Sequence, residues 1–235
     1  MHHKRINIFT GNFGSGKTEV SVNYAMRLGE IFNRTAIVDL DIVNPYFRTA
    51  DAKEELERKG VLVITPLFAN TNVDIPALPP EINMLLENKE YTAVFDVGGD
   101  DVGALALSRY KEKIMEEDYG HYFVVNVNRP MTNSVEKIKE MFYSIEESSG
   151  LKITGIVNNT NLLENTRITD ILKGQEIIEK AALELGVPVV FTSIFKGIFN
   201  KNYGTNYCPE ADTERIGIKG NILLMEKMIR LPWEK

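Results

Sequence analysis

The sequence predicts a three-layer α/β fold with a mostly parallel sheet of about seven strands flanked by helices. Short runs of β-branched and aromatic residues recur along the chain. Stretches with helical periodicity lie between most of these runs. Strands that alternate with helices form right-handed βαβ units, so the sheet is expected to be parallel and covered on both faces.

The predicted strands share a length of four to six residues and a high content of valine, isoleucine and aromatic residues. They are Ile6–Phe9, Thr35–Val38, Val61–Ile64, Thr92–Phe95, Tyr122–Val127, Ile153–Val157 and Val189–Thr192.

Two helices have clear boundaries in the sequence. Asn133 and Glu136 predict an N-terminal cap for the first, and Gly150 is placed to end it. The second is predicted near Gly174–Leu185 and ends at Gly186. The carboxyl ends of parallel strands are where ligands bind, so we expect the functional residues just after each strand.

Bulk properties indicate one soluble domain that spans residues 1–235, with an irregular segment and a final helix after about Ile194. The formal net charge of −6 argues against broad binding to nucleic acid. The single cysteine, Cys208, excludes an internal disulfide and fits a cytoplasmic location. No apolar run is long enough to span a membrane.

The segment after the first strand carries the strongest motif. Residues 11–18 read Gly-Asn-Phe-Gly-Ser-Gly-Lys-Thr, a full match to the phosphate loop GxxxxGK[ST]. Glycines let the backbone curl so that its N–H groups face phosphate oxygens, and the following helix adds its positive N-terminus. Lys17 is expected to reach the β- and γ-phosphates and to act in catalysis, and the Thr18 hydroxyl to bind Mg²⁺.

The cofactor-binding residues predicted from this loop are its eight members and the residue that follows them. They are Gly11, Asn12, Phe13, Gly14, Ser15, Gly16, Lys17, Thr18 and Glu19.

Carboxylates follow two further strands. Asp96 closes the fourth strand and is predicted to hold Mg²⁺, while Gly99 is placed where its N–H senses the γ-phosphate. Asp41, after the second strand, is predicted to orient the attacking water or to join the Mg²⁺ ligands, with Asp39 as the alternative. Such aspartates also occur as helix caps and turn formers.

These three segments together resemble the SIMIBI class of P-loop NTPases. The class includes the CobQ/CobB/MinD/ParA nucleotide-binding family, the nitrogenase iron protein, carbon monoxide dehydrogenase maturation ATPases and nickel-insertion GTPases. Asp39–Asp41 looks like the DxD segment of MinD and ParA, which implies that Asp41 orients water, and residues 95–100 look like the second switch of the iron protein. Asn12 stands where MinD and ParA carry a lysine. The resemblance implies a nucleotide-linked homodimer.

The identity of the nucleotide base is predicted from Asn158, Asn159 and Asn161, which follow the sixth predicted strand. GTPases of the class place an aspartate where Asn161 stands, and an amide oxygen cannot accept both guanine N–H groups as a carboxylate does. ATP-using relatives place an asparagine where Asn159 stands. ATP is therefore the expected nucleotide, with GTP as the alternative; these asparagines also have the simpler role of shaping a turn.

The sequence leaves several functions open. We expect an Mg²⁺-dependent ATPase that acts as a conformational switch on a protein partner, in metalloenzyme or cofactor maturation. The alternatives are a small-molecule phosphotransferase or ligase of the dethiobiotin or cobyrinate synthetase type, a GTP-dependent metallochaperone, and a binding module that hydrolyses little.

Overall fold

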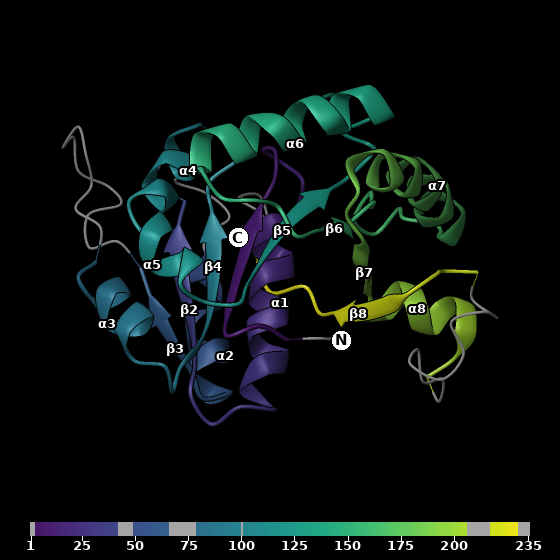
Figure 1. Ribbon diagram of the computed structural model, residues 1–235. Coiled ribbons are helices and arrows are strands. Elements are labelled where there is room, and N and C mark those ends of the chain that lie inside the picture. Colours follow the sequence, from purple (N-terminus) through teal and green to yellow (C-terminus); the bar gives the residue numbers. More distant parts are fainter. Residues whose placement is uncertain (1–2, 42–48, 66–78, 100, 206–216, 230–235) are drawn as a thin grey trace, which may run out of the picture.

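The sheet contains eight strands, each parallel to its neighbours, in the order β3-β2-β4-β1-β5-β6-β7-β8 (Figure 1). This computed structural model describes residues 3–41, 49–65, 79–99, 101–205 and 217–229; the side chains of residues 101 and 102 lie outside the description. The strands are β1 Ile6–Thr10, β2 Thr35–Leu40, β3 Val61–Ile64, β4 Thr92–Val97, β5 Tyr119–Val125, β6 Gly155–Asn158, β7 Val189–Phe195 and β8 Asn221–Met225.

Helices connect most of the strands, as the alternating sequence pattern predicts. They are α1 Lys17–Gly29, α2 Lys53–Arg58, α3 Glu81–Glu87, α4 Asp101–Ser108, α5 Lys111–Met115, α6 Val135–Ser149, α7 Ile168–Leu185 and α8 Lys196–Tyr203. A short 3₁₀ helix, Thr49–Ala52, precedes α2.

Two helical layers cover the sheet, because alternate residues of each buried strand face opposite sides. On one side, Phe9 and Val94 pack with Val20 and Leu28 of α1 and Leu56 of α2. On the other side, strand residues such as Ile8, Phe123 and Ile194 pack against helices α3 to α8. The predicted three-layer α/β fold is confirmed, with eight strands in place of about seven.

The segment after Ile194 is more regular than the sequence indicates. We predicted irregular chain and a final helix, but β7 extends to Phe195, α8 follows at once, and β8 adds to the sheet beside β7. The run Asn221–Met225 has only four apolar residues, too few to identify a strand. Backbone pairing with β7 stabilises this run as a strand, which its own short apolar sequence does not do. Residues 206–216 and 230–235 lie outside the described residues, as does Cys208.

Two helix starts also differ from the prediction. Helix α6 is capped by Ser134, whose hydroxyl accepts a hydrogen bond from Lys137 N, so Asn133 is not the cap. Helix α7 begins at Ile168, six residues before Gly174. Gly174 therefore lies inside the helix. A Cβ atom there would lie 2.1 Å from the Thr160 hydroxyl oxygen, so only glycine lets α7 pack on this loop. Gly150 and Gly186 end the two helices as predicted.

No helix in the described ranges is both long enough and apolar enough to cross a membrane.

His121 is a buried histidine in the centre of the sheet. It lies on β5 beside β1, and its Nε2 is 3.0 Å from the Thr10 hydroxyl oxygen. Burial lowers the pKa of His121 to about 4, because an imidazolium there loses its hydration. The folded protein therefore keeps this ring neutral at pH values where the unfolded chain protonates it.

We predict that His121 makes folding sensitive to acid. Between about pH 6.5 and the folded-state pKa of about 4, the unfolded chain binds an additional proton, so His121 lowers stability as pH falls, by up to about 1.4 kcal/mol per pH unit. The His121→Gln variant, which has no titrating ring, should lose less stability than the parent between pH 7.5 and pH 5 in urea unfolding. Equal losses in both proteins would contradict this.

Candidate functional site

The phosphate loop joins β1 to α1 and leaves the first turn of α1 uncapped by a side chain. Its curve is closed by a hydrogen bond from Ser15 N to Asn12 O at 3.0 Å. Gly14 and Gly16 have φ of 75° and 82°, a region that favours glycine. Gly16 is the N-cap of α1 and offers no side-chain acceptor to the first N–H groups of the helix. These groups and the helix dipole suit an anion.

Close backbone approach fixes this loop against the neighbouring strands. A Cβ atom on Gly11 would lie 2.6 Å from Val124 O at the end of β5, and one on Gly16 would lie 2.4 Å from Asn159 Nδ2. Both positions therefore require glycine.

Gly99 brings the segment after β4 against the same loop. A Cβ atom on Gly99 would lie 2.7 Å from both Gly11 O and Phe13 N. The backbone after β4 thus touches the phosphate loop directly, and a shift of either segment would displace the other. A contact of Gly99 with a γ-phosphate stays a prediction.

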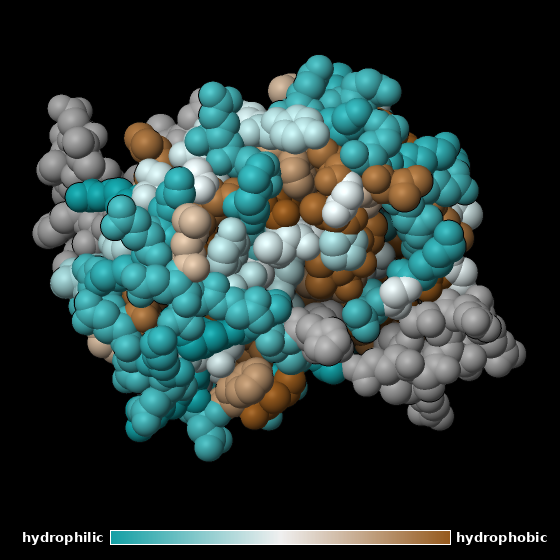
Figure 2. Space-filling model, in the orientation of Figure 1, coloured by the Kyte–Doolittle hydropathy of each residue, from teal (hydrophilic) through white to brown (hydrophobic). Residues whose placement is uncertain are grey.

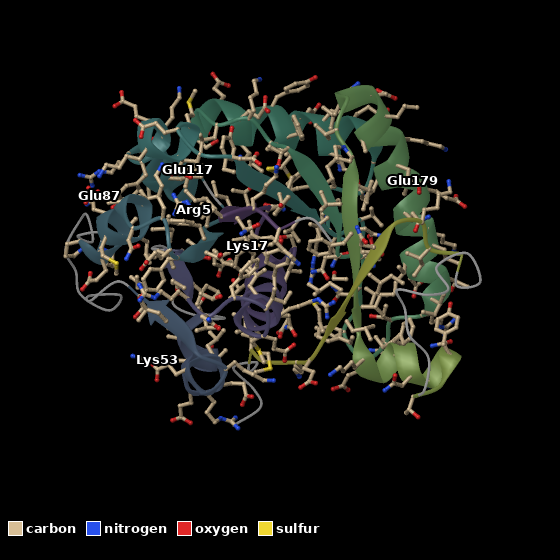
Figure 3. The ribbon with its side chains drawn as sticks, turned by 60° about the horizontal axis from the view of Figure 1, so that its bottom comes forward. Arg5, Lys17, Lys53, Glu87, Glu117 and Glu179 are labelled. Carbon is tan, nitrogen blue, oxygen red and sulfur yellow. The ribbon has the colours of Figure 1, made fainter. Side chains whose placement is uncertain are left out.

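A buried cluster of charges lies where β2 and β4 end. Lys17 Nζ is 3.3 Å from Asp41 Oδ2, and both side chains are more than nine-tenths buried. Figure 3 shows Lys17 inside the molecule, whereas Lys53 and Glu179 lie at its outside. The strand register sets Asp39 of β2 beside Asp96 of β4, and Asp39 Oδ1 accepts a hydrogen bond from Asp41 N at 2.9 Å. The fold therefore brings Lys17 of the phosphate loop close to the aspartates predicted at the ends of β2 and β4.

Asp96 is the most deeply buried carboxyl of this cluster. It is fully buried, which raises its pKa to about 6, although Lys17 and the Thr18 hydroxyl act in the opposite direction. Its Oδ2 accepts a hydrogen bond from the Thr49 hydroxyl at 3.2 Å. Its Oδ1 has no hydrogen-bond partner among the described residues. A buried oxygen with this environment is suited to a cation or to an ordered water.

These residues fit a Mg²⁺ ion. In the described ranges, no three His, Cys, Asp or Glu side chains are placed to hold a metal ion by themselves. Mg²⁺ usually needs no such cluster, because it takes one or two protein oxygens together with phosphate oxygens and water. The Thr18 hydroxyl and the free Oδ1 of Asp96 match that pattern. The predicted metal-binding roles of Thr18, Asp39, Asp41 and Asp96 stay predictions.

The three asparagines at the end of β6 and in the loop after it have different surroundings. Asn159 holds the phosphate loop, since its Nδ2 donates to Ser15 O at 2.7 Å while its Oδ1 accepts from the Ser193 hydroxyl at 2.6 Å. Asn158 is fully buried and turns toward α7, where its Nδ2 donates to Ile171 O. It does not reach the pocket described below, so the structure does not bring it to the predicted base contact.

Asn161 lies at the pocket, although its amide is engaged within its own loop. Its Nδ2 donates to Asn159 O and its Oδ1 accepts from Leu163 N. Leu163 has φ of 53°, a left-handed conformation that costs a leucine free energy. This backbone strain occurs in the pocket wall, where strained residues are often functional.

A pocket of about 440 Å³ opens between the phosphate loop and the ends of β6, β7 and β8. One end is polar and contains the loop, and the other is mainly apolar. Figure 2 shows hydrophobic residues gathered near the middle of the face of the molecule that it draws, over β5, β6 and β7. The lining residues are Asn12, Phe13, Gly14, Gly16, Lys17, Thr18, Glu19, Arg129, Pro130, Asn159, Asn161, Leu163, Phe195, Met225, Lys227 and Ile229.

Seven of these residues were missed by the sequence analysis. Arg129, Pro130 and Leu163 belong to loops without a motif, and Phe195 ends β7. The others come from β8 and the segment after it, and no residue pattern there signals a ligand.

Glu19 attaches this C-terminal segment to α1. Its Oε1 accepts from Met228 N at 2.6 Å and its Oε2 from Ile229 N at 3.3 Å. Asn23, one turn along α1, exchanges two hydrogen bonds with the backbone of Glu226. Burial raises the pKa of Glu19 to about 7. Although Glu19 lines the pocket, the structure uses its carboxylate to hold a pocket wall.

Comparisons with known proteins agree on the fold. Neither a protein-family model nor a curated protein matches the sequence. The cell division protein FtsY from Thermotoga maritima is similar, with 20% identity, a TM-score of 0.53, and coverage of 80% of this chain and 61% of that one. A nucleotide-binding protein from Archaeoglobus fulgidus in complex with ADP has 15% identity, a TM-score of 0.47, and coverage of 83% and 85%.

FtsY from Mycoplasma mycoides has 15% identity, a TM-score of 0.44, and coverage of 80% of this chain and 60% of that one. This chain therefore spans about three fifths of the length of the FtsY chains. At such identities the likeness shows the fold alone. The predicted three-layer α/β fold is confirmed, and the FtsY structure from Thermotoga maritima shares it.

We predict that Gly99→Ala lowers stability by about 1 to 3 kcal/mol, because the new methyl group overlaps the phosphate-loop backbone. Urea unfolding would measure the change. Gly197→Ala is the matched control, because a Cβ atom on this α8 residue meets nothing within 4 Å, and it should leave stability unchanged or slightly higher. A Gly99→Ala protein as stable as the parent would contradict the close contact.

Proposed function

We propose that this protein binds ATP with Mg²⁺ in the 440 Å³ pocket and hydrolyses it. One observation carries the proposal. The uncapped phosphate loop and Lys17 line one pocket that also has apolar walls, and the Lys17 ammonium pairs with Asp41 in the buried carboxylate cluster behind the loop. A nucleotide has the same division, with a charged phosphate chain at one end and a purine at the other.

Lys17 and Asp41 have complementary roles in this proposal. The two are an ion pair 3.3 Å apart in a buried setting. A phosphate chain carries several negative charges, so it competes with Asp41 for the ammonium group. Asp41 then becomes available to accept a hydrogen bond from the attacking water and orient it. Thr18 and Asp96 would hold a Mg²⁺ ion, which would supply charge stabilisation for the phosphate chain.

The pocket chemistry favours adenine over guanine. Recognition of guanine needs an acceptor for its N1–H and N2–H groups, and a carboxylate serves best. Among the described residues that line the pocket, Glu19 is the single acid, and both of its oxygens accept backbone N–H groups. Leu163, Phe195 and Ile229 offer apolar surface to a purine ring.

We predict that the parent protein binds the ATP analogue AMP-PNP in the presence of Mg²⁺ more tightly than GMP-PNP, as measured by calorimetric titration. Lys17→Ala and Thr18→Ala should each weaken AMP-PNP binding at least tenfold, because each removes a partner of the phosphate–metal group. Circular dichroism would check folding. Nucleotide binding in folded variants that equals that of the parent would refute the site.

We further propose that the nucleotide acts as a conformational switch on a protein partner in metalloenzyme or cofactor maturation. Gly99 touches the backbone of Gly11 and Phe13, so a phosphate that moves the loop also moves the segment after β4. Asp41 immediately precedes residues 42–48, which lie outside the described residues. Loops that sense a γ-phosphate commonly change conformation on hydrolysis. A nucleotide-linked homodimer is part of the same hypothesis.

We predict that AMP-PNP and ADP give different limited-proteolysis patterns near residues 41–48 and 96–103. Mass spectrometry of the fragments would map the cleavage sites, and the Lys17→Ala protein, which should show no nucleotide effect, is the control. Identical patterns with both nucleotides would argue against a switch. Turnover that requires an added small-molecule acceptor would instead indicate a phosphotransferase.

A further inference from the structure

Arg129 lies against the outer side of the phosphate loop. It belongs to the connection between β5 and α6, and its side chain is exposed. Its Nε donates a hydrogen bond to Gly14 O at 2.7 Å. The guanidinium covers Gly14, since a Cβ atom there would lie 3.3 Å from Nε and 3.5 Å from Cζ. Arg129 also belongs to the lining of the pocket.

The backbone that carries Arg129 is held firmly. Arg129 N donates to Asn126 O at 3.0 Å, and the buried Thr132 hydroxyl donates to the same oxygen at 2.8 Å. Asn126 Nδ2 in turn donates to Asn161 O at 3.1 Å, which joins this connection to the loop after β6. The start of the side chain is therefore already ordered, and a ligand contact needs little further loss of conformational entropy.

The guanidinium retains donors for a ligand. Its one hydrogen bond to the described part of the chain uses Nε, so both terminal nitrogens have no partner there. Two terminal NH₂ groups in a fixed plane match the oxygens of a phosphate, which an arginine binds through paired hydrogen bonds.

The charge of the site also favours a second cation. Lys17 is buried and its charge is offset by Asp41 at 3.3 Å, with Asp39 and Asp96 beside them. Nucleoside triphosphates add several more negative charges at the same place. Arg129 approaches Gly14 from the exposed side, whereas Lys17 comes from the buried start of α1.

We propose that Arg129 binds the phosphate chain of the nucleotide from the exposed side of the phosphate loop. This inference rests on the nucleotide-binding function proposed above. Arg129 thereby neutralises phosphate charge that the buried, acid-rich cluster leaves uncompensated. The Nε–Gly14 hydrogen bond sets the direction of the guanidinium and makes its position depend on the conformation of the loop.

The test compares ligands that differ in phosphate number. Calorimetric titrations with adenosine, AMP, ADP and AMP-PNP in the presence of Mg²⁺ are made on the parent, Arg129→Ala and Arg129→Lys. Arg34→Ala is the matched control, because Arg34 is an exposed arginine that immediately precedes β2, at the amino ends of the strands, whereas the phosphate loop follows the carboxyl end of β1. Circular dichroism and urea unfolding check that each variant folds.

We expect Arg129→Ala to weaken AMP-PNP binding about tenfold to a hundredfold, the range for a hydrogen bond to a charged group. The loss should grow with the number of phosphates and be less than about twofold for adenosine. Arg129→Lys should recover part of the affinity, because it keeps the charge without the planar fork. Arg34→Ala should bind as the parent does.

Two results would overturn the inference while the proposed function stands. In the first, the parent binds AMP-PNP and Arg129→Ala binds it equally well. In the second, Arg129→Ala weakens adenosine as much as AMP-PNP, so that Arg129 only supports the loop. A parent protein that binds none of the phosphorylated ligands would refute the nucleotide-binding function itself, and the role of Arg129 with it.

Discussion

The phosphate loop depends on backbone contacts that leave no space for a side chain. Gly11 approaches the carbonyl group of Val124, Gly16 approaches the Asn159 amide, and Gly99 approaches the loop from the segment after β4. Main chain of β5, main chain after β4 and the Asn159 side chain after β6 thereby meet one curved piece of backbone. The loop conformation, the direction of its N–H groups and the position of α1 follow from these contacts.

Burial of charge is the second constraint on the site. Lys17, Asp39, Asp41 and Asp96 are all nearly inaccessible to water. The removal of charges from water is costly, and it is tolerated here because the ammonium pairs with a carboxylate and backbone or hydroxyl groups donate to others. The raised pKa of Asp96, about 6, reflects the part of this cost that its neighbours do not offset. A cluster so constrained responds strongly to any ligand that changes its charge.

The apolar half of the pocket has a different origin. Its walls come from the loop after β6, the end of β7 and the segment after β8, and Glu19 and Asn23 fasten that segment to α1. The helix that begins at the phosphate loop thus also supports the apolar wall of the pocket. Movement of α1 would change both halves of the pocket together. This arrangement connects the phosphate loop, through α1, to the segment after β8.

The sequence by itself determined the alternation of strands and helices, the phosphate loop at residues 11–18 and the carboxylates after β2 and β4, because each depends on local residue order. It also predicted that Gly150 and Gly186 end α6 and α7, because the residue that ends a helix often adopts a left-handed backbone conformation, which favours glycine. Only the tertiary structure decided the register that sets Asp39 beside Asp96, the existence of β8 and the inward turn of Asn158. It likewise brought Arg129 to Gly14 and Glu19 to residues 228 and 229. The Arg129 and Glu19 contacts join residues more than a hundred positions apart, and no local pattern encodes which backbone group outside its own segment a side chain will meet.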